Sequence, residues 1–254
     1  MNRAQIKMMN GSIANLFRNA LGISSHHPGW MLFMVKALIH QKMAAAKRIQ
    51  WEDKGVHVPP FAIASITSTC NLRCKGCYAR TNLKQKGMEM TRKEWKRVFE
   101  EASELGISLI LLAGGEPLVR SDMIALAAEY PHIIFPVFTN GLLLDEEKAR
   151  MLKKHKNIIP VISVEGLEDC TDTRRGEGVW EKVTQNMQLL KKHKIFFGVS
   201  VTLTQSNFET VTDGDFVRNL KDKGSRLFFY VEYIPVDPGT ENQVVTIKIG
   251  RAHV

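Results

Sequence analysis

Three of the four cysteines of this chain lie within eight positions, in the segment "TCNLRCKGCYAR" at residues 69–80. Cys70, Cys74 and Cys77 have the spacing C-x3-C-x2-C. Clustered thiols can form a disulfide, act as a redox pair, or bind zinc or an iron–sulfur cluster. Each of these chemistries makes a different demand on the rest of the chain.

The number of cysteines and the expected cellular compartment help to distinguish these four alternatives. The basic residues near the N-terminus are not followed by a continuous apolar core, so we expect no secretory signal and a reducing, cytoplasmic location. A disulfide would leave an odd thiol there, and a structural zinc ion would need a fourth ligand such as His57 or Cys170. A redox pair would use only Cys74 and Cys77. Three thiolates on one loop best suit a four-iron cluster whose fourth iron keeps an open position. Cys170 itself stays unassigned.

Six apolar, β-branched segments alternate with helical patterns after residue 60. The expected strands are 61–67, 107–113, 132–139, 157–165, 194–204 and 226–234, and the expected helices begin near Thr91 and Ser121 and cover 144–155, 179–193 and 209–222. Thr91 can cap its helix together with Glu94. Buried strands separated by helices predict a parallel sheet, which right-handed crossovers curl into a partial (β/α)6 TIM-like barrel of the α/β class.

Unusual loops follow the predicted strands. The cysteine segment follows the first, "GGEP" (114–117) the second, "TNG" (139–141) the third, and "SVEG" (163–166) with "TRRGEG" the fourth. In such sheets ligands bind at the carboxyl ends of the strands. We therefore expect these loops to converge on one rim.

The C-x3-C-x2-C motif after the first strand and "GGEP" after the second resemble the radical S-adenosylmethionine superfamily over about residues 60–235. The resemblance implies that Cys70, Cys74 and Cys77 hold a [4Fe-4S] cluster and that S-adenosylmethionine binds the open iron. Reductive cleavage would then give a 5′-deoxyadenosyl radical, which abstracts a hydrogen atom from a substrate. The alternative is a non-catalytic iron–sulfur or zinc protein that uses the cysteine loop for electron transfer or structure.

The resemblance also implies contacts for the methionine part of the cosubstrate. The edge formed by Gly114, Gly115 and Glu116 would receive the methionine ammonium, and glycines allow a backbone to approach a ligand closely. Arg175 would meet the methionine carboxylate, for which a guanidinium fork is well suited. Its neighbour Arg174 is expected to be solvated.

The ribose and adenine contacts are less sharply indicated. Ser163 and Glu165 alternate with a valine, so they should share one side of the sheet and could bind the ribose hydroxyls by resemblance. Family members commonly carry an aromatic residue before the third cysteine, which packs beside the adenine, but this chain has Gly76 there. That role passes to Tyr78 or to another side chain. Asn140 is a candidate pocket residue, although Asn-Gly is as often a plain turn.

On the fifth strand, Ser200 and Thr202 share one face and are candidate contacts inside the barrel.

Residues outside the barrel form two further expected regions, 1–58 as a basic helical extension and 237–254 as an incomplete C-terminal segment, around a core at 59–236. Residues 1–51 contain seven Lys or Arg and no acid. The helical pattern over 30–49 is expected to cover the core or one end of the domain, in preference to lying on an anionic membrane surface. Nucleic-acid binding is not expected.

The last residues, "IGRAHV" (249–254), match a common sequencing-adapter read-through, so we expect a truncated chain with a non-native tail. The expected partners are a reductant protein such as a flavodoxin or ferredoxin and an unidentified substrate. Modification of a peptide or protein, or maturation of a cofactor, is favoured.

Overall fold

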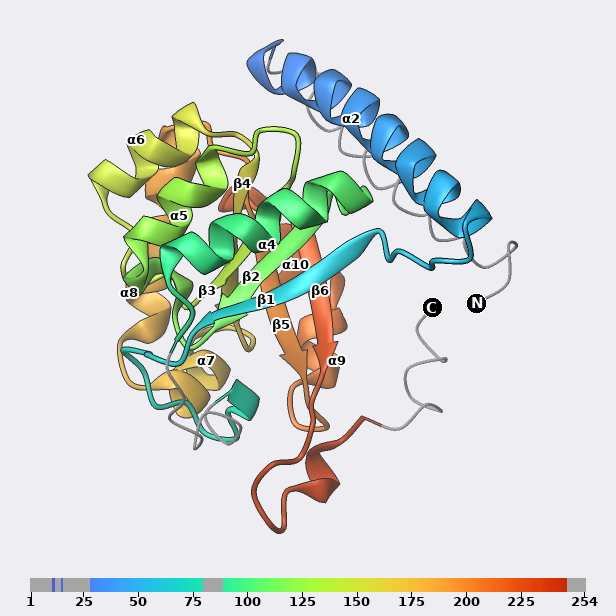
Figure 1. Ribbon diagram of the computed structural model, residues 1–254. Coiled ribbons are helices and arrows are strands. Elements are labelled where there is room, and N and C mark those ends of the chain that lie inside the picture. Colours follow the sequence, from blue (N-terminus) through green and yellow to red (C-terminus); the bar gives the residue numbers. More distant parts are fainter. Residues whose placement is uncertain (1–10, 12–14, 16–27, 80–88, 246–254) are drawn as a thin grey trace.

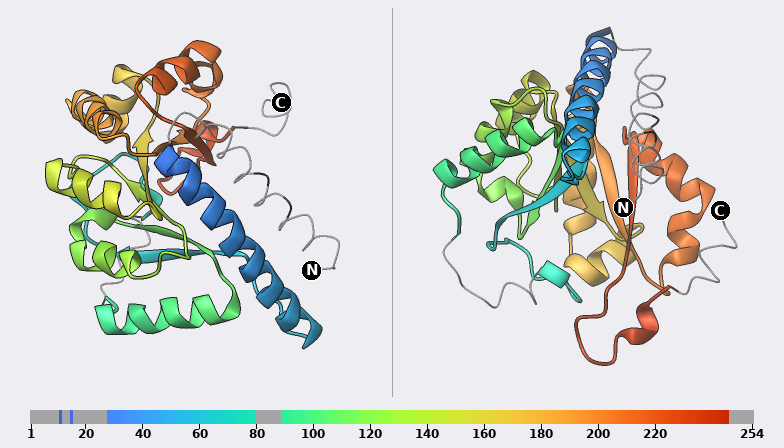
Figure 2. Two further views of the ribbon diagram at one scale, coloured as in Figure 1. Left: turned by 90° about the horizontal axis from the view of Figure 1, so that it is seen from above. Right: turned by 45° about the vertical axis from the view of Figure 1, so that its right-hand side comes forward.

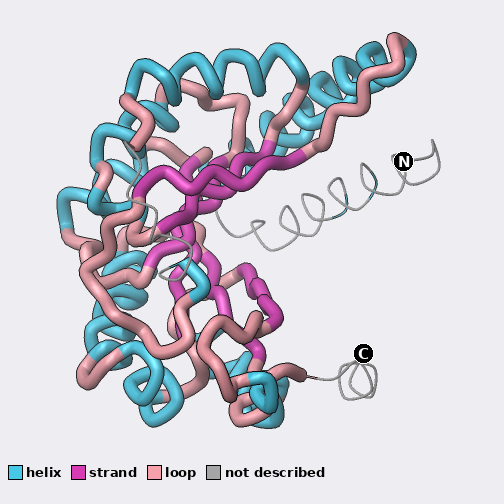
Figure 3. The backbone as a smooth tube through the Cα atoms, turned by 60° about the horizontal axis from the view of Figure 1, so that its bottom comes forward, coloured by secondary structure: helices cyan, strands magenta, loops and turns pink. Residues whose placement is uncertain are grey.

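A single parallel sheet of six strands forms the centre of the molecule, in a computed structural model that describes residues 11, 15, 28–79 and 89–245 (Figure 1). The strands follow one another in the order of the chain: β1 (Phe61–Thr67), β2 (Leu109–Gly114), β3 (Phe135–Thr139), β4 (Ile158–Val164), β5 (Gly198–Leu203) and β6 (Leu227–Glu232). All five neighbouring pairs are parallel. The sheet is curved, and β1 and β6 form its two edges (Figure 3). The expected partial barrel is confirmed.

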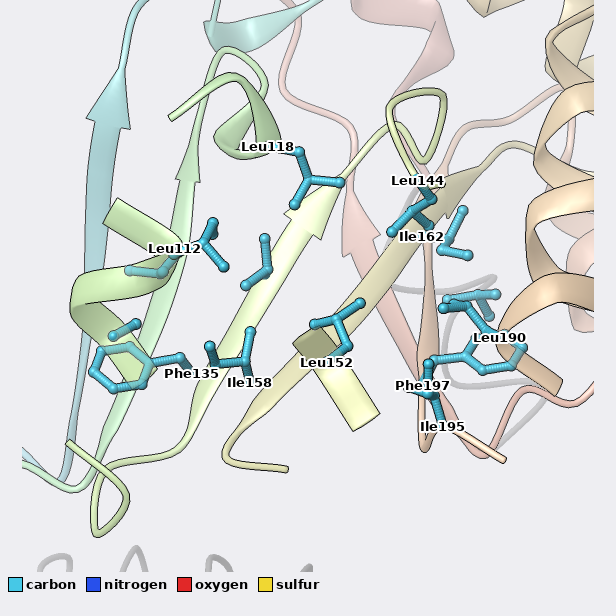
Figure 4. Close-up of a cluster of buried hydrophobic side chains, with 14 of the residues drawn as sticks. Leu112, Leu118, Phe135, Leu144, Leu152, Ile158, Ile162, Leu190, Ile195 and Phe197 are labelled. Atoms are coloured by element: carbon cyan, nitrogen blue, oxygen red, sulfur yellow. The ribbon is translucent and has the colours of Figure 1, made fainter. Parts of the chain in front are cut away.

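Helices cover the convex face of the sheet. They are α4 (Arg92–Leu105), α5 (Ser121–Ala128), α6 (Glu146–Lys154), α7 (Glu168–Arg175), α8 (Val179–Lys192), α9 (Phe208–Thr212) and α10 (Gly214–Asp222), with short 3-10 turns at Pro117–Val119 and Glu241–Gln243. The core between the two layers contains the fully buried side chains of Leu112, Phe135, Ile158 and Phe197 (Figure 4). Burial of each such side chain stabilises the fold by about 1.5–3 kcal/mol, and this layer holds the strands in place.

Helix α2 (Pro28–Asp53) lies across the end of the barrel where the strands begin (Figures 1 and 2). Trp30, Met34 and Ala37 of this helix pack against residues near the start of strands, among them Ile159 and Phe196. The indole nitrogen of Trp30 also donates a hydrogen bond of 2.8 Å to the carbonyl of Lys194. The helix expected over 30–49 therefore covers one end of the domain.

Polar contacts at the other end of α2 fix its position. Gln41 and Ser108 exchange two hydrogen bonds, of 2.6 and 3.3 Å. The guanidinium of Arg48 donates to the carbonyl of Gly106, and burial lowers the pKa of Arg48 to about 10. No helix in the described part of the chain combines the length and apolar character that a membrane span requires.

Local sequence signals account for several helix ends. Thr91 and Glu94 form the predicted capping box at the start of α4. The helix predicted over 209–222 is instead broken, because Asp213 is extended and accepts the backbone N–H of Asp215 at 2.7 Å, which begins α10. Helix α7 was not predicted. The tail at 249–254 lies outside the described residues.

Candidate cofactor site

The three clustered cysteines lie on the connection that follows β1. Cys70 is exposed, whereas Cys74 and Cys77 are half-buried, and all are free thiols. Burial raises the pKa of Cys70 and of Cys74, and the negative charge of neighbouring thiolates raises both further. Within the described ranges, no three His, Cys, Asp or Glu side chains are grouped closely enough to hold a single metal ion. Three thiols on one loop suit a four-iron cluster that keeps one iron open.

The "GGEP" loop packs directly on the cysteine segment. The backbone N–H groups of Gly115 and Glu116 donate to the carbonyls of Thr67 and Thr69, both at 2.8 Å. A Cβ atom on Gly115 would lie 2.2 Å from the carbonyl oxygen of Thr69, and one on Gly114 would lie 2.3 Å from that of Thr67. The two glycines thus let this loop lie against the backbone that carries the first cysteine, and their contact with the methionine ammonium stays a prediction.

The side chain of Glu116 is completely buried. Its carboxylate accepts hydrogen bonds from the backbone N–H groups of Leu118 and Asn140, at 2.9 and 2.7 Å, and from the hydroxyl of Thr139 at 2.7 Å. Burial raises the pKa of Glu116 despite these donors. The carboxylate therefore joins the loops that follow β2 and β3, and its contact with a methionine ammonium stays a prediction.

Asn140 lies beside the first cysteine. Its side-chain amide donates to Asn71 at 2.7 Å and stands 4.0 Å from the sulfur of Cys70, while its carbonyl oxygen accepts the N–H of Leu142 at 3.0 Å. The turn at Asn140 therefore also lies against the cysteine segment. An N–H group near a cluster sulfur influences the reduction potential of the cluster.

Glu165, Arg174 and Arg175 form a nearly dry ion-pair group at the end of β4. The Glu165 side chain is only 2% exposed, and its two oxygens accept from Nη1 of Arg174 at 2.7 Å and from Nε of Arg175 at 2.9 Å. The positive charge of Arg175 also lowers the pKa of Cys74 and of Glu116 against the effect of burial, so it acts on both the cysteine loop and the "GGEP" loop. The ribose role of Glu165 and the carboxylate role of Arg175 stay predictions.

The expectation that Arg174 is solvated is wrong. Its side chain is 18% exposed, and it donates to the carbonyls of Lys75 at 3.1 Å and Gly76 at 3.4 Å, while its own carbonyl accepts the N–H of Lys75 at 2.9 Å. The reason is helix α7, which turns Arg174 toward the cysteine loop. Arg174 therefore fastens the stretch between Cys74 and Cys77 to Glu165.

The aromatic ring of Tyr233, which directly follows the last strand β6, lies against Gly76. Gly76 has φ of +60°, and a Cβ atom there would lie 2.7 Å from the hydroxyl oxygen of Tyr233. The Tyr233 ring is buried, with the guanidinium of Arg174 at 5.7 Å from its centroid. Tyr78, the sequence candidate for adenine packing, is 55% exposed. The spatial neighbour of Gly76 could not be inferred from the spacing of the motif.

A pocket of about 520 Å³ opens beside these groups. Its lining includes Gly76, Glu165, Cys170, Arg174, Asn207 and Tyr233. The amide of Asn207 donates to the carbonyls of Glu165 at 2.8 Å and Thr202 at 2.9 Å, which joins the ends of β4 and β5. Ser163 and Ser200 are paired in the register of these strands, one position before their last pair.

Glu89 is a further residue that the sequence did not single out. Its carboxylate accepts from the hydroxyl of Thr67 at 2.9 Å and from the N–H of Ser68 at 2.6 Å, and it pairs with Arg120 at 3.2 Å. The N–H of Ser68 is the main cause that lowers the pKa of Glu89. Glu89 thereby holds the start of the cysteine segment, although no motif marks it.

The chain is similar to one protein family and to several known proteins. The model of the Radical SAM superfamily matches residues 64–222. The chain is 28% identical to the Fe-coproporphyrin III synthase of Methanosarcina barkeri over 155 residues. This matched segment makes up 60% of this chain and 39% of that protein. It is 40% identical to the PqqA peptide cyclase of Granulibacter bethesdensis over 103 residues. This matched segment makes up 38% of this chain and 26% of that protein.

Among solved structures, Streptococcus suis SuiB bound to S-adenosylmethionine has a TM-score of 0.68 at 18% identity, over 85% of this chain and 51% of that chain. The chain thus spans between about a quarter and about half of the length of these proteins. The fold of SuiB agrees with the six-stranded half-barrel. The chain therefore belongs to the radical SAM superfamily, whose cofactors are a [4Fe-4S] cluster and S-adenosylmethionine.

Proposed function

We propose that this chain reductively cleaves S-adenosylmethionine and uses the resulting radical to abstract a hydrogen atom from a substrate. The observation that carries the proposal is that the cysteine loop is hydrogen-bonded to other loops at the carboxyl ends of the strands. Its start is bonded to the "GGEP" loop, and its end is bonded to Arg174. A loop used only to transfer electrons would not need a buried ion-pair group and a 520 Å³ pocket at its side.

The residues of the rim divide the work. Cys70, Cys74 and Cys77 would hold the cluster. When bound, the reduced cluster and S-adenosylmethionine supply a 5′-deoxyadenosyl radical. Arg175, already paired with a carboxylate, would turn its fork to the methionine carboxylate. Glu165, freed from that pair, would accept the ribose hydroxyls while Arg174 keeps its other oxygen neutralised.

Tyr78 or Tyr233 would pack beside the adenine, and the backbone at Gly114, Gly115 and Glu116 would receive the methionine ammonium. Ser163 and Asn140 would complete the polar wall. We regard residues 59–236 as the catalytic unit, between the extension at 1–58 and the segment at 237–254.

We further propose a peptide or protein substrate, with a cofactor precursor as the second candidate. Two observations support an extended substrate: both edges of the sheet are unpaired within the described residues, and Ile63 of β1 and Val231 of β6 are 67% and 46% exposed there. A crystal structure of SuiB contains its precursor peptide, and the other relatives are named for a peptide and for a porphyrin. We expect a flavodoxin or ferredoxin as the electron donor and a cytoplasmic location.

The proposal is tested by anaerobic reconstitution of the chain with iron and sulfide, followed by dithionite and S-adenosylmethionine. The expected product is 5′-deoxyadenosine, quantified by chromatography. An intact, reducible cluster that yields no 5′-deoxyadenosine would support the rival function, a non-catalytic iron–sulfur protein.

Two cysteine variants sharpen this test. Cys74→Ala is expected to abolish both the cluster absorbance and the cleavage product. Cys170→Ala removes a thiol that lines the same pocket without belonging to the motif, and it should leave both largely intact.

A further inference from the structure

Helix α2 buries only one of its faces. Its outward face carries a stripe of large apolar side chains at spacings of three and four residues, which places them on one side of the helix. They are Leu32, Val35, Ile39 and Met43, exposed by 59, 42, 53 and 59%. Scattered exposed apolar residues need no explanation, but a continuous stripe marks a surface that contacts something.

A basic pocket borders this stripe. It has a volume of about 570 Å³ and lies between α2, the loop before β3 and the loop after α6. Three lysines and two histidines line it: Lys36, Lys154, Lys156, His40 and His155. None of the described residues that line this pocket is an Asp or a Glu. The pocket is therefore suited to a phosphate-bearing group.

The basic groups of this pocket are only partly engaged. Lys156 donates to the carbonyl of Gly29 at 3.0 Å, and its ammonium lies 5.9 Å from the centre of the Trp30 ring. Lys36 and Lys154 are both exposed, and among the described residues neither has an acidic partner within salt-bridge distance. Two exposed ammonium groups thus flank the apolar stripe without an acidic partner among the residues that the structure describes.

The charge of the helix decides between the partners that an apolar stripe could take. Helix α2 carries four basic residues along its length and only two acids, Glu52 and Asp53 at its very end, so a second copy of this face would bring like charges together. An anionic lipid surface offers the complementary charge and an apolar layer beneath it. The helix lies at the end of the barrel opposite to α7 and the cysteine loop, so such contact would leave the rim open (Figure 1).

We propose that the outward face of α2 docks on an anionic phospholipid bilayer, with Leu32, Val35, Ile39 and Met43 entering the headgroup boundary and the basic pocket taking a lipid phosphate. The helix is a surface contact and crosses no membrane. This inference does not depend on the proposed reaction.

The test is flotation of the cluster-loaded full chain with two kinds of vesicle. Vesicles of phosphatidylcholine mixed with phosphatidylglycerol should carry the protein to the top of the gradient, and vesicles of phosphatidylcholine alone should not. Each lysine near an anionic surface contributes about fivefold in binding, the equivalent of about 1 kcal/mol. Lys36→Gln combined with Lys154→Gln should therefore weaken binding by about 25-fold. Lys182→Gln with Lys221→Gln, two exposed lysines elsewhere, is the matched control and should change it little.

The apolar contribution has its own pair of variants. Ile39→Gln should weaken binding by about tenfold, because an isoleucine leaves the headgroup boundary for water. Val98→Gln on α4, which is 36% exposed, should have no such effect. Equal losses in the site and control variants, or no flotation of the wild-type chain with the anionic vesicles, would overturn the proposal. A dimer in solution that Ile39→Gln dissociates would assign the face to self-association instead.

Discussion

The contact between Gly115 and Thr69 gives the sharpest prediction. Gly115 has no positive φ, so an alanine there meets no backbone strain and its cost is steric alone. The new Cβ atom would lie 2.2 Å from the carbonyl oxygen of Thr69, whereas contacts under 3.0 Å essentially never occur. The two backbones must therefore separate by at least 0.8 Å, which is 3.0 minus 2.2.

This separation has a calculable consequence. The hydrogen bond from Glu116 N–H to Thr69, now 2.8 Å, would lengthen to 3.6 Å or more, and the neighbouring bond from Gly115 to Thr67 would be strained with it. Loss of both would cost about 1–3 kcal/mol, at roughly 0.5–1.5 kcal/mol for each. A chain of this size would lose about 2–4 °C of melting temperature per kcal/mol. Cys70 directly follows Thr69, so cluster assembly should suffer as well.

Gly115→Ala should therefore melt earlier than the wild type and bind less iron per chain after anaerobic reconstitution, as measured by circular dichroism and by iron analysis. Gly214→Ala is the matched control, because its Cβ atom would meet only the flexible end of the Arg218 side chain at 3.1 Å. If Gly115→Ala matches Gly214→Ala in both measurements, the close approach of the two loops has been misjudged.

Two further predictions concern other charged groups. Arg174→Gln removes the donors to the carbonyls of Lys75 and Gly76 but leaves Glu165 paired with Arg175. We expect the cluster absorbance of this variant to decay several-fold faster than that of the wild type in the presence of a chelator. Equal decay rates would contradict the role of Arg174 in holding the cysteine loop. Burial, with smaller contributions from His40 and Lys47, lowers the pKa of His132 below that of an unfolded histidine, so the unfolded state binds a proton first as the pH falls. Stability should therefore drop as the pH falls through about 6.5. His132→Gln should reduce this drop in melting temperature between pH 7.5 and 5.5, whereas an unchanged drop would assign it to other groups.

The sequence predicted the elements whose causes are local. The six strands are short β-branched runs, and the capping box at Thr91 needs only residues three positions apart. Strand limits were predicted too long, as for 194–204 against Gly198–Leu203, because apolar residues continue into the buried turns before the strands. The break at Asp213 was missed because a single side-chain cap outweighed a continuous helical pattern.

The site shows where such inference ends. The cysteines and "GGEP" are adjacent in the fold because consecutive parallel strands are neighbours, which the order of the strands already implied. The contact of Gly76 with Tyr233 joins residues far apart in the chain, and no motif in the sequence links the two positions. The roles of Arg174 and Arg175 could not be separated by spacing, because the position of α7 decides which arginine faces the cysteine loop.

The covering of one barrel end by α2 restricts how a reactant can enter. Side chains such as Trp30 and Met34 fill the space at the start of the strands, which removes that end as a route. Among the described residues, α2 leaves uncovered the rim and the long side between β1 and β6, whose edges are unpaired there. Through that side a chain can be laid in along its length without being threaded. A residue in the middle of a long polymer could then react as readily as one at its end, and release would need no passage of a free end.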